Sequence, residues 1–148
     1  MKHVWILLIS FALLSCSSDT ENIEKPAGVP DLETLIGTTW QLTDLNGQDV
    51  LPDVPVILDF ADSTNISGSG GCNRYFAEFT LSNSKFKLGP IGSTRMMCPA
   101  DTLQQEEQYF EALQNAKSLK VHNSMLEVAC EGYVEPLRFA RREKPYDD

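Results

Sequence analysis

Short apolar runs separated by turn-forming residues dominate this chain. Apolar and polar side chains alternate through residues 38–45, as in a half-buried strand, and the Asn46-Gly47 pair that follows is typical of a tight hairpin turn. A second apolar run covers residues 54–60, where Pro55 lacks an amide hydrogen and therefore belongs at a strand edge or start. The pattern up to residue 60 predicts two strands.

The β pattern continues through the middle of the chain. Residues 65–71 are too rich in glycine to pack through side chains, so we expect a bulged strand or a tight corner where backbones approach closely. Residues 75–81 and 85–88 predict a hairpin that turns at residues 82–84. Further short strands are expected after the helix described next, at residues 118–121, 125–130 and 137–139.

One segment changes from a period of two to a helical period. Residues 102–117 predict a helix that places Leu103, Phe110, Leu113 and Ala116 on one face and glutamates and glutamines opposite. Seven or eight strands with one late helix predict a mainly β fold, an antiparallel barrel-like or strongly curved sheet with the helix packed against it. A parallel α/β fold is disfavoured because helices do not alternate with strands.

The N-terminal residues predict export and a lipid anchor. Lys2 precedes an apolar run at residues 4–14, which is the length of a signal-peptide core and too short to span a bilayer. Leu13-Leu14-Ser15-Cys16 resembles a bacterial lipobox, which predicts residues 1–15 as a lipoprotein signal peptide and Cys16 as the lipidated new N-terminus. Residues 16–31 are polar and proline-containing, as in a flexible tether.

Charge narrows the range of partners. The chain carries a net charge of −9, and loss of residues 1–15, where Lys2 alone is charged, leaves 11 basic and 21 acidic residues, a net charge of −10. Such an excess of negative charge argues against nucleic acid as a partner. The predicted partner is a membrane, reached through the lipid on Cys16 and not through basic side chains.

Two segments carry the most distinctive chemistry. They are residues 67–75 (SGSGGCNRY) and residues 91–98 (IGSTRMMC), and Glu106-Glu107 follow on the predicted helix. Together with Gly37-Thr38-Thr39-Trp40 and the Asn46-Gly47 turn, they resemble the META domain, the family of HslJ-like heat-shock lipoproteins. The resemblance covers residues 32–140 and leaves residues 141–148 as a loose tail.

The resemblance implies a fold but does not imply a particular activity. It implies a barrel-like antiparallel β domain with a helix, similar in shape to the pilotin lipoproteins of type III secretion. Family members are associated with the cell envelope, stress response and novobiocin resistance, without an assigned catalytic activity or a settled ligand. The expected location is the bacterial cell envelope, at the outer membrane, since Ser17 and not Asp follows Cys16.

The cysteines allow two interpretations. Cys72 and Cys98 each follow a turn-rich stretch in a chain expected to be exported, so they can form a disulfide or remain two neighbouring buried thiols. Cys130 shares a strand face with apolar residues and is interpreted as a buried core thiol. His122 is the single histidine after the predicted signal peptide, so we expect no metal site and no cofactor.

A polar cluster is the remaining candidate site. Asn73, Arg95 and one of Glu106 or Glu107 would meet if Cys72 lies beside Cys98. The cluster could recognise a polar ligand or peptide terminus through Arg95, or it could simply satisfy backbone groups; we favour the structural interpretation.

The sequence therefore favours a binding function over catalysis. His122 sits next to a turn without a nucleophile and base pattern, which makes a hydrolase the minor alternative. We expect a non-enzymatic accessory protein that binds another envelope protein. The alternative is a barrel that carries an apolar small molecule or lipid, because barrels often enclose cavities.

Overall fold

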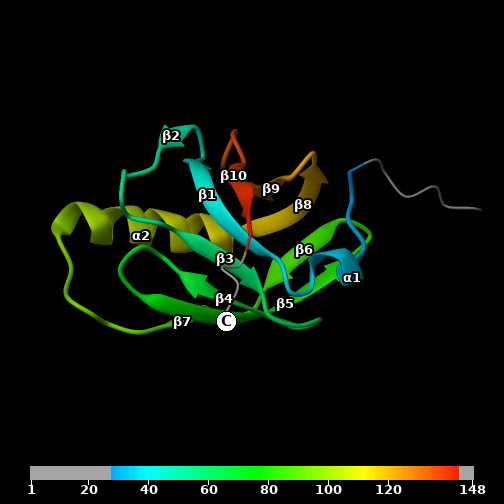
Figure 1. Cartoon of the computed structure of the whole chain (residues 1–148), viewed down its shortest axis with the longest axis horizontal. Helices are drawn as coiled ribbons and strands as arrows, with labels where there is room; N and C mark the ends of the chain where they lie inside the picture. Colours follow the sequence, from blue (N-terminus) through cyan, green and yellow to red (C-terminus); the bar gives the residue numbers. More distant parts are fainter. Residues whose placement is uncertain (1–27, 144–148) are drawn as a thin grey trace, which may run out of the picture.

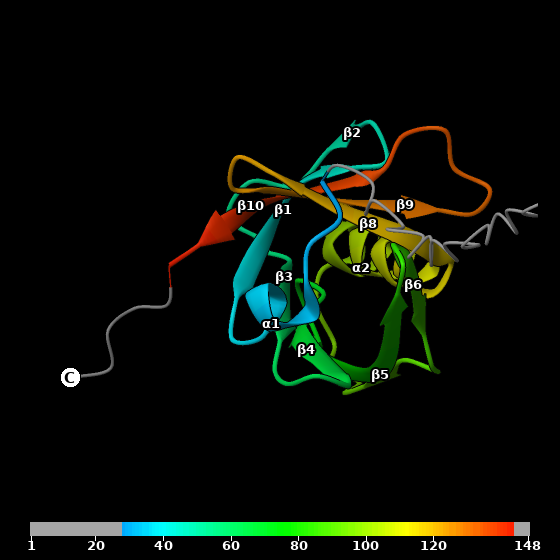
Figure 2. The same cartoon turned by 90° about the vertical axis from the view of Figure 1, so that its right-hand side faces the viewer.

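A ten-stranded antiparallel sheet forms the body of the molecule (Figures 1 and 2). The computed structural model describes residues 28–143. Eight strands close into a barrel in the order β10-β9-β8-β6-β5-β4-β3-β1, because β1 pairs with β10, while β2 and β7 are short additions on β1 and β5. The strands are β1 (Thr39–Leu45), β2 (Gln48–Asp49), β3 (Ile57–Phe60), β4 (Asn65–Ser69), β5 (Arg74–Ser82), β6 (Lys85–Leu88), β7 (Gly92–Ser93), β8 (Ala116–His122), β9 (Met125–Cys130) and β10 (Leu137–Arg142). The helices are α1 (Leu32–Leu35) and α2 (Ala100–Gln114).

This architecture confirms the expected mainly β barrel with one main helix. The strand count exceeds seven or eight because the two-residue strands β2 and β7 are too short to show a period. The helix is α2, which begins at Ala100 and ends at Gln114, so residues 115–117 were wrongly placed in it. Ala116 instead pairs with Cys130 and starts β8.

The domain also extends further at both ends than expected. The backbone N–H of Val121 donates to the carbonyl of Gly28 at 2.8 Å, so the last residues of the predicted tether pack on the barrel. Arg141 and Arg142, predicted as tail, continue β10 beside Trp40 and Thr39. The predicted signal peptide, Cys16 and residues 144–148 lie outside the described residues.

Three tight hairpins set the register of the barrel. Each turns on two residues with positive φ, which matches the right-handed twist of the strands that it joins. These pairs are Asn46-Gly47 between β1 and β2, Asn83-Ser84 between β5 and β6, and Asn123-Ser124 between β8 and β9. The turns predicted at these three places are therefore present.

Gly68 explains the glycine-rich stretch that leads into the corner between β4 and β5. It lies in β4, opposite Leu58 of β3 and Tyr75 of β5. A Cβ atom at this position would overlap the carbonyl oxygen of Ile57 and press on the Tyr75 ring. Glycine therefore allows the close backbone approach that was expected at residues 65–71.

Large side chains fill the inside of the barrel. Trp40, Phe60, Phe86, Tyr109 and Phe139 are each at most 1% exposed. A cavity large enough for a water molecule would leave accessible surface on the side chains that line it, and these large residues have almost none. The barrel interior is thus a packed core, with α2 lying within the outline of the ring beneath β8 (Figure 2).

A pair of buried tyrosines crosses the centre of this core. Tyr109 of α2 and Tyr75 of β5 share a hydrogen bond of 2.7 Å between their hydroxyl groups, and Tyr75 donates to the carbonyl of Ile57 at 3.1 Å. Burial raises the pKa of both hydroxyls well above their ordinary value of 10.0. The pair fixes α2 to the side of the barrel formed by β3 and β5.

This tyrosine pair predicts a loss of stability at alkaline pH. In the unfolded chain both phenols ionise near pH 10, whereas the fold keeps them protonated, so their contribution is present below pH 10 and is lost as pH rises above it. We expect phenolate absorbance at 295 nm from these two residues to appear together with the loss of far-ultraviolet circular dichroism. A variant with Tyr75→Phe and Tyr109→Phe should show a flatter alkaline decline, and phenolate formation in the native fold would contradict the prediction.

Candidate functional site

Glu106 of α2 forms the centre of the principal polar cluster. Its side chain is buried, with the residue 5% exposed, and its carboxylate accepts three hydrogen bonds. Oε2 accepts from the backbone N–H groups of Cys72 at 3.1 Å and Asn73 at 2.6 Å, and Oε1 accepts from Nδ2 of Asn73 at 2.6 Å. Hydrogen bonds to a carboxylate are the stronger kind, so this cluster holds α2 firmly to the corner between β4 and β5.

Asn73 extends the cluster to the segment that leads from β7 to α2. Its side-chain oxygen Oδ1 accepts from Oγ1 of Thr94 at 2.9 Å and from the backbone N–H of Met96 at 2.7 Å. Thr94 also accepts from the backbone N–H of Arg74 at 3.2 Å. One buried asparagine thus links the corner, the helix and residues 94–96.

A disulfide covers the same junction. Cys72 and Cys98 are bonded, with their Cα atoms 6.1 Å apart and a sequence separation of 26. Of the two arrangements left open by the sequence, the structure has the disulfide. Together with Glu106 and Asn73 it ties residues 94–98 to the barrel at several points.

Small residues at the corner make room for the carboxylate. A Cβ atom on Gly70 would lie 2.7 Å from Oε2 of Glu106 and 2.7 Å from the Phe110 ring. Gly71 has a φ of +111°, which L side chains rarely adopt. The glycines of the SGSGG sequence therefore allow both the turn and the close approach of α2.

The expected cluster was only partly right. The structure brings Asn73 and Glu106 together, but Arg95 is exposed, and no hydrogen bond or ion pair reaches its side chain within residues 28–143. Glu107 is also exposed, because one residue along a helix turns the side chain by about 100°. Residues 94–96 reach Asn73 instead through Oγ1 of Thr94 and the backbone N–H of Met96.

The helix face was assigned only partly correctly, since Leu113 is buried as expected but Leu103 and Phe110 are only partly buried. Its buried face includes Gln105 and Glu106, which the apolar period placed on the solvent side. Oε1 of Gln105 accepts from the backbone N–H of Leu51 at 2.6 Å, while Nε2 has no hydrogen-bond partner within the described chain. These polar side chains are buried because the loops around them offer backbone donors, which hydrophobic periodicity does not reveal.

The acceptor oxygens of this cluster are already bonded to groups of the protein and are not open to a ligand. Both Glu106 oxygens and the Asn73 oxygen are already used by donors from the protein. None of the surface cavities of 220, 270, 410 and 500 Å³ found on residues 28–143 is lined by Asn73 or Glu106. The geometry is that of a structural junction and not of a substrate cleft.

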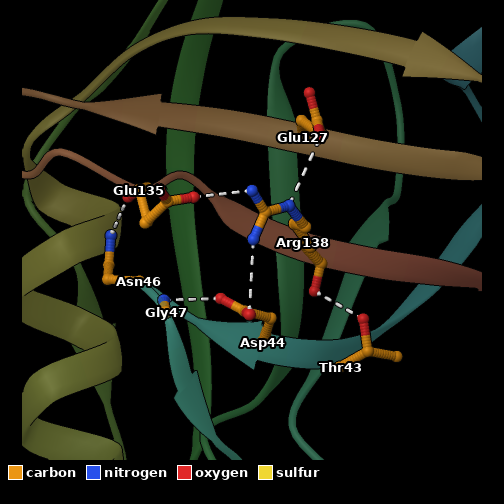
Figure 3. Close-up of polar contacts among 7 residues, drawn as sticks. All are labelled: Thr43, Asp44, Asn46, Gly47, Glu127, Glu135 and Arg138. Atoms are coloured by element: carbon orange, nitrogen blue, oxygen red, sulfur yellow. Dashed lines mark hydrogen bonds and ion pairs between the residues drawn. The ribbon is translucent and has the colours of Figure 1, made fainter.

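A second polar cluster is centred on the side chain of Arg138 in β10 (Figure 3). No sequence pattern had predicted it. Its guanidinium pairs with three carboxylates from three parts of the chain: Asp44 at 3.3 Å, Glu127 at 3.4 Å and Glu135 at 2.7 Å. The bond to Glu135, with the nearby Asp44, raises the pKa of Arg138. Because β1 and β10 meet here to close the barrel, this cluster secures the closure.

The other two candidate residues lie apart from both clusters. Cys130 is a free, buried thiol, and burial raises its pKa to about 11, which keeps it protonated near neutral pH. His122 is exposed at the end of β8, with its ring beside Gly28. Cys130 is the core thiol that the alternating pattern predicted.

No three His, Cys, Asp or Glu side chains in the described part of the chain are arranged to hold a metal ion. Neither helix within residues 28–143 has the length and apolar character needed to cross a bilayer.

Comparisons with known proteins agree with the fold. The model of the META domain family matches residues 33–144. A solved protein from Burkholderia xenovorans is 24% identical with a TM-score of 0.62, covering 84% of this chain and 99% of its own. A second solution structure is 26% identical with a TM-score of 0.63, and the match covers 76% of this chain and 95% of that one.

A more distant relative shares the fold alone. The DUF4847 family protein from Bacteroides vulgatus is 16% identical with a TM-score of 0.54, covering 76% of this chain and 98% of its own. No functionally curated protein matches the chain.

Proposed function

The chain belongs to the META domain family, and on that premise we propose that it is a lipid-anchored protein of the bacterial envelope that acts by binding another protein. The observation that carries the anchor is Leu13-Leu14-Ser15-Cys16 at the end of a short apolar run. Two or three acyl chains on one cysteine hold a protein stably, because each buried methylene contributes about 0.8 kcal/mol. We place it at the outer membrane, with a role in envelope stress or antibiotic resistance, as the family resemblance implies.

Packing favours this function over a carrier of lipids or small molecules. A carrier needs a cavity inside the barrel, yet the largest interior side chains are at most 1% exposed. The cavities described on residues 28–143 lie among strand surfaces and loops, and one of 500 Å³ is open on the outside of β5 and β6. A ligand-binding barrel would require repacking of aromatic residues such as Trp40 and Phe86.

The closed polar cluster likewise favours binding over catalysis. A catalytic carboxylate must reach a substrate, whereas Glu106 is buried and accepts three hydrogen bonds from the protein. The free thiol of Cys130 is buried and its pKa is raised to about 11, so it is a poor nucleophile. These properties support an accessory role without a reaction of its own.

Labelling of Cys16 tests the anchor. Cells that express the full chain and are fed an alkyne analogue of palmitate should give a labelled protein that fractionates with membranes. Cys16→Ser should lose the label and leave the membrane fraction, while Ser17→Ala, a matched change one residue on, should keep both. Labelling that persists in Cys16→Ser would contradict the proposal.

Chemical crosslinking in intact cells tests the binding role. An amine-reactive crosslinker can reach exposed lysines such as Lys85 and Lys120, so a bound protein should appear as one defined larger species. Recovery of free monomer alone, at crosslinker doses that join other envelope proteins, would count against an accessory function.

A further inference from the structure

Three exposed apolar side chains lie in two neighbouring segments, the start of β5 and the stretch between β7 and α2. Phe76 is 67% exposed, Met96 61% and Met97 98%. Arg74 and Arg95 are also exposed and lie in the same two segments. We call these five residues the Met-Arg patch.

The patch is held in place by the polar cluster described above. Oδ1 of Asn73 fixes the backbone of Met96, Thr94 bonds to the backbone of Arg74, and the disulfide ends the segment at Cys98. The ring of Phe76 lies over Gly92, where a Cβ would be 2.7 Å from it. An exposed loop fixed in this way loses little entropy on binding, so it is preorganised for a partner.

The patch differs in charge from the rest of the molecule. Within residues 28–143 neither Arg74 nor Arg95 takes part in an ion pair, whereas Arg138 alone is paired with three carboxylates. The whole chain carries a net charge of −9. Two guanidinium groups without an ion pair among the described residues thus lie in the same two segments as the exposed apolar side chains, on an acidic protein.

We propose that the Met-Arg patch is the docking surface for a protein segment that presents carboxylates beside apolar side chains. Phe, Met and Arg are the residue types enriched in the centres of protein interfaces. Carboxylates of the partner would accept paired hydrogen bonds from the two arginines, and its apolar side chains would cover Met96, Met97 and Phe76. This inference rests on the proposed function and adds the surface and the partner's chemistry.

The position of the patch favours a protein over the bilayer. The described chain starts at Gly28, next to His122, at the end of the molecule opposite the segment that joins β7 to α2 (Figure 1). The patch and the N-terminal side of the described chain thus lie at opposite ends of the domain, so the patch is open to a protein whenever the N-terminal side faces the membrane. The overall negative charge also opposes contact with anionic lipid headgroups.

Site-specific photocrosslinking tests the surface. The full chain is expressed in its native bacterium with p-benzoylphenylalanine in place of Met97, or in place of Val134 as the matched control, since both residues are 98% exposed. We expect an adduct from position 97 and none from position 134. Mass spectrometry should place the adduct in a partner segment that contains Asp or Glu next to apolar residues.

Charge reversal then tests the chemistry. With the identified partner and the purified, folded chain, Arg95→Glu and Arg74→Glu should each weaken the dissociation constant at least tenfold. Arg142→Glu, an exposed arginine at the end of β10, should change it less than twofold. Unchanged far-ultraviolet circular dichroism and melting temperature show that the variants are folded.

The other outcomes overturn the inference in distinguishable ways. Adducts from position 97 to lipid would make the patch a membrane contact, and adducts to a second copy of the chain would make it a self-association surface. A partner found by amine-reactive crosslinking, but never from position 97, would overturn the patch and leave the proposed function standing. No partner by either method would overturn both.

Discussion

Glu106→Ala should lower the free energy of unfolding by about 4 kcal/mol. The change leaves the backbone N–H groups of Cys72 and Asn73 and the Asn73 amide without their acceptor in a buried place. Each buried donor without a partner costs about 1 to 3 kcal/mol, and partial relaxation or entry of water reduces the sum. Urea denaturation followed by circular dichroism measures the effect.

Glu107→Ala is the matched control for this change. Glu107 is the next residue of α2 and is exposed, so its loss should alter the free energy of unfolding by less than about 0.5 kcal/mol. Glu106→Gln should fall between the two, because one oxygen remains while the new NH₂ group faces the backbone donors. Equal effects of Glu106→Ala and Glu107→Ala would show that the cluster does not hold the corner.

Removal of the disulfide should have the second large effect. Replacing Cys72 and Cys98 by serine is expected to lower the free energy of unfolding by about 3.5 kcal/mol, since the bond closes a loop between residues with a sequence separation of 26. In the chain-entropy model the unfolded chain gains the freedom that the bond removed. The midpoint of urea denaturation should fall, and dithiothreitol should produce a similar shift in the unchanged protein.

The local readout for this prediction is cleavage by trypsin after Arg95. This residue is exposed but lies in a segment held by Asn73 and the disulfide, so the oxidised protein should resist cleavage there. Reduction or the double serine variant should speed cleavage at Arg95 more than at Arg142. Cys130→Ala retains the disulfide and should leave cleavage at Arg95 unchanged, and equal cleavage in all forms would contradict a fixed segment.

Local patterns predicted most of the fold. Alternation with a period of two indicates a strand that buries one face, and the Asn-Gly pair supplies the positive φ values of a hairpin turn. Strand β1 and the turn after it could therefore be predicted from the sequence. The glycines of residues 65–71 indicated close backbone approach, and Gly68 lies against the carbonyl of Ile57. Two-residue strands such as β7 gave no pattern because two residues cannot show a period.

The candidate site was harder to predict because it depends on partners far away in the chain. The helical period assigned Glu106 to solvent, since periodicity ranks residues by hydrophobicity and not by available hydrogen bonds. In the fold, three donors from residues 72 and 73 reach that carboxylate and make its burial acceptable. The spacing correctly predicted that the segment around Arg95 lies next to Asn73. It wrongly predicted that the Arg95 side chain joins the cluster, since that side chain is exposed.

The sequence by itself determined the strands, the tight turns, the single main helix, the buried Cys130 and the resemblance to the META domain. It also predicts a lipidated Cys16, which remains a prediction because that residue lies outside the described structure. Only the tertiary structure decided that Glu106 and not Glu107 joins Asn73, that Arg95 faces solvent, and that aromatic residues fill the barrel. Period and turn chemistry act between neighbours in the chain, whereas these outcomes depend on which distant groups the closed barrel brings within hydrogen-bond or packing distance.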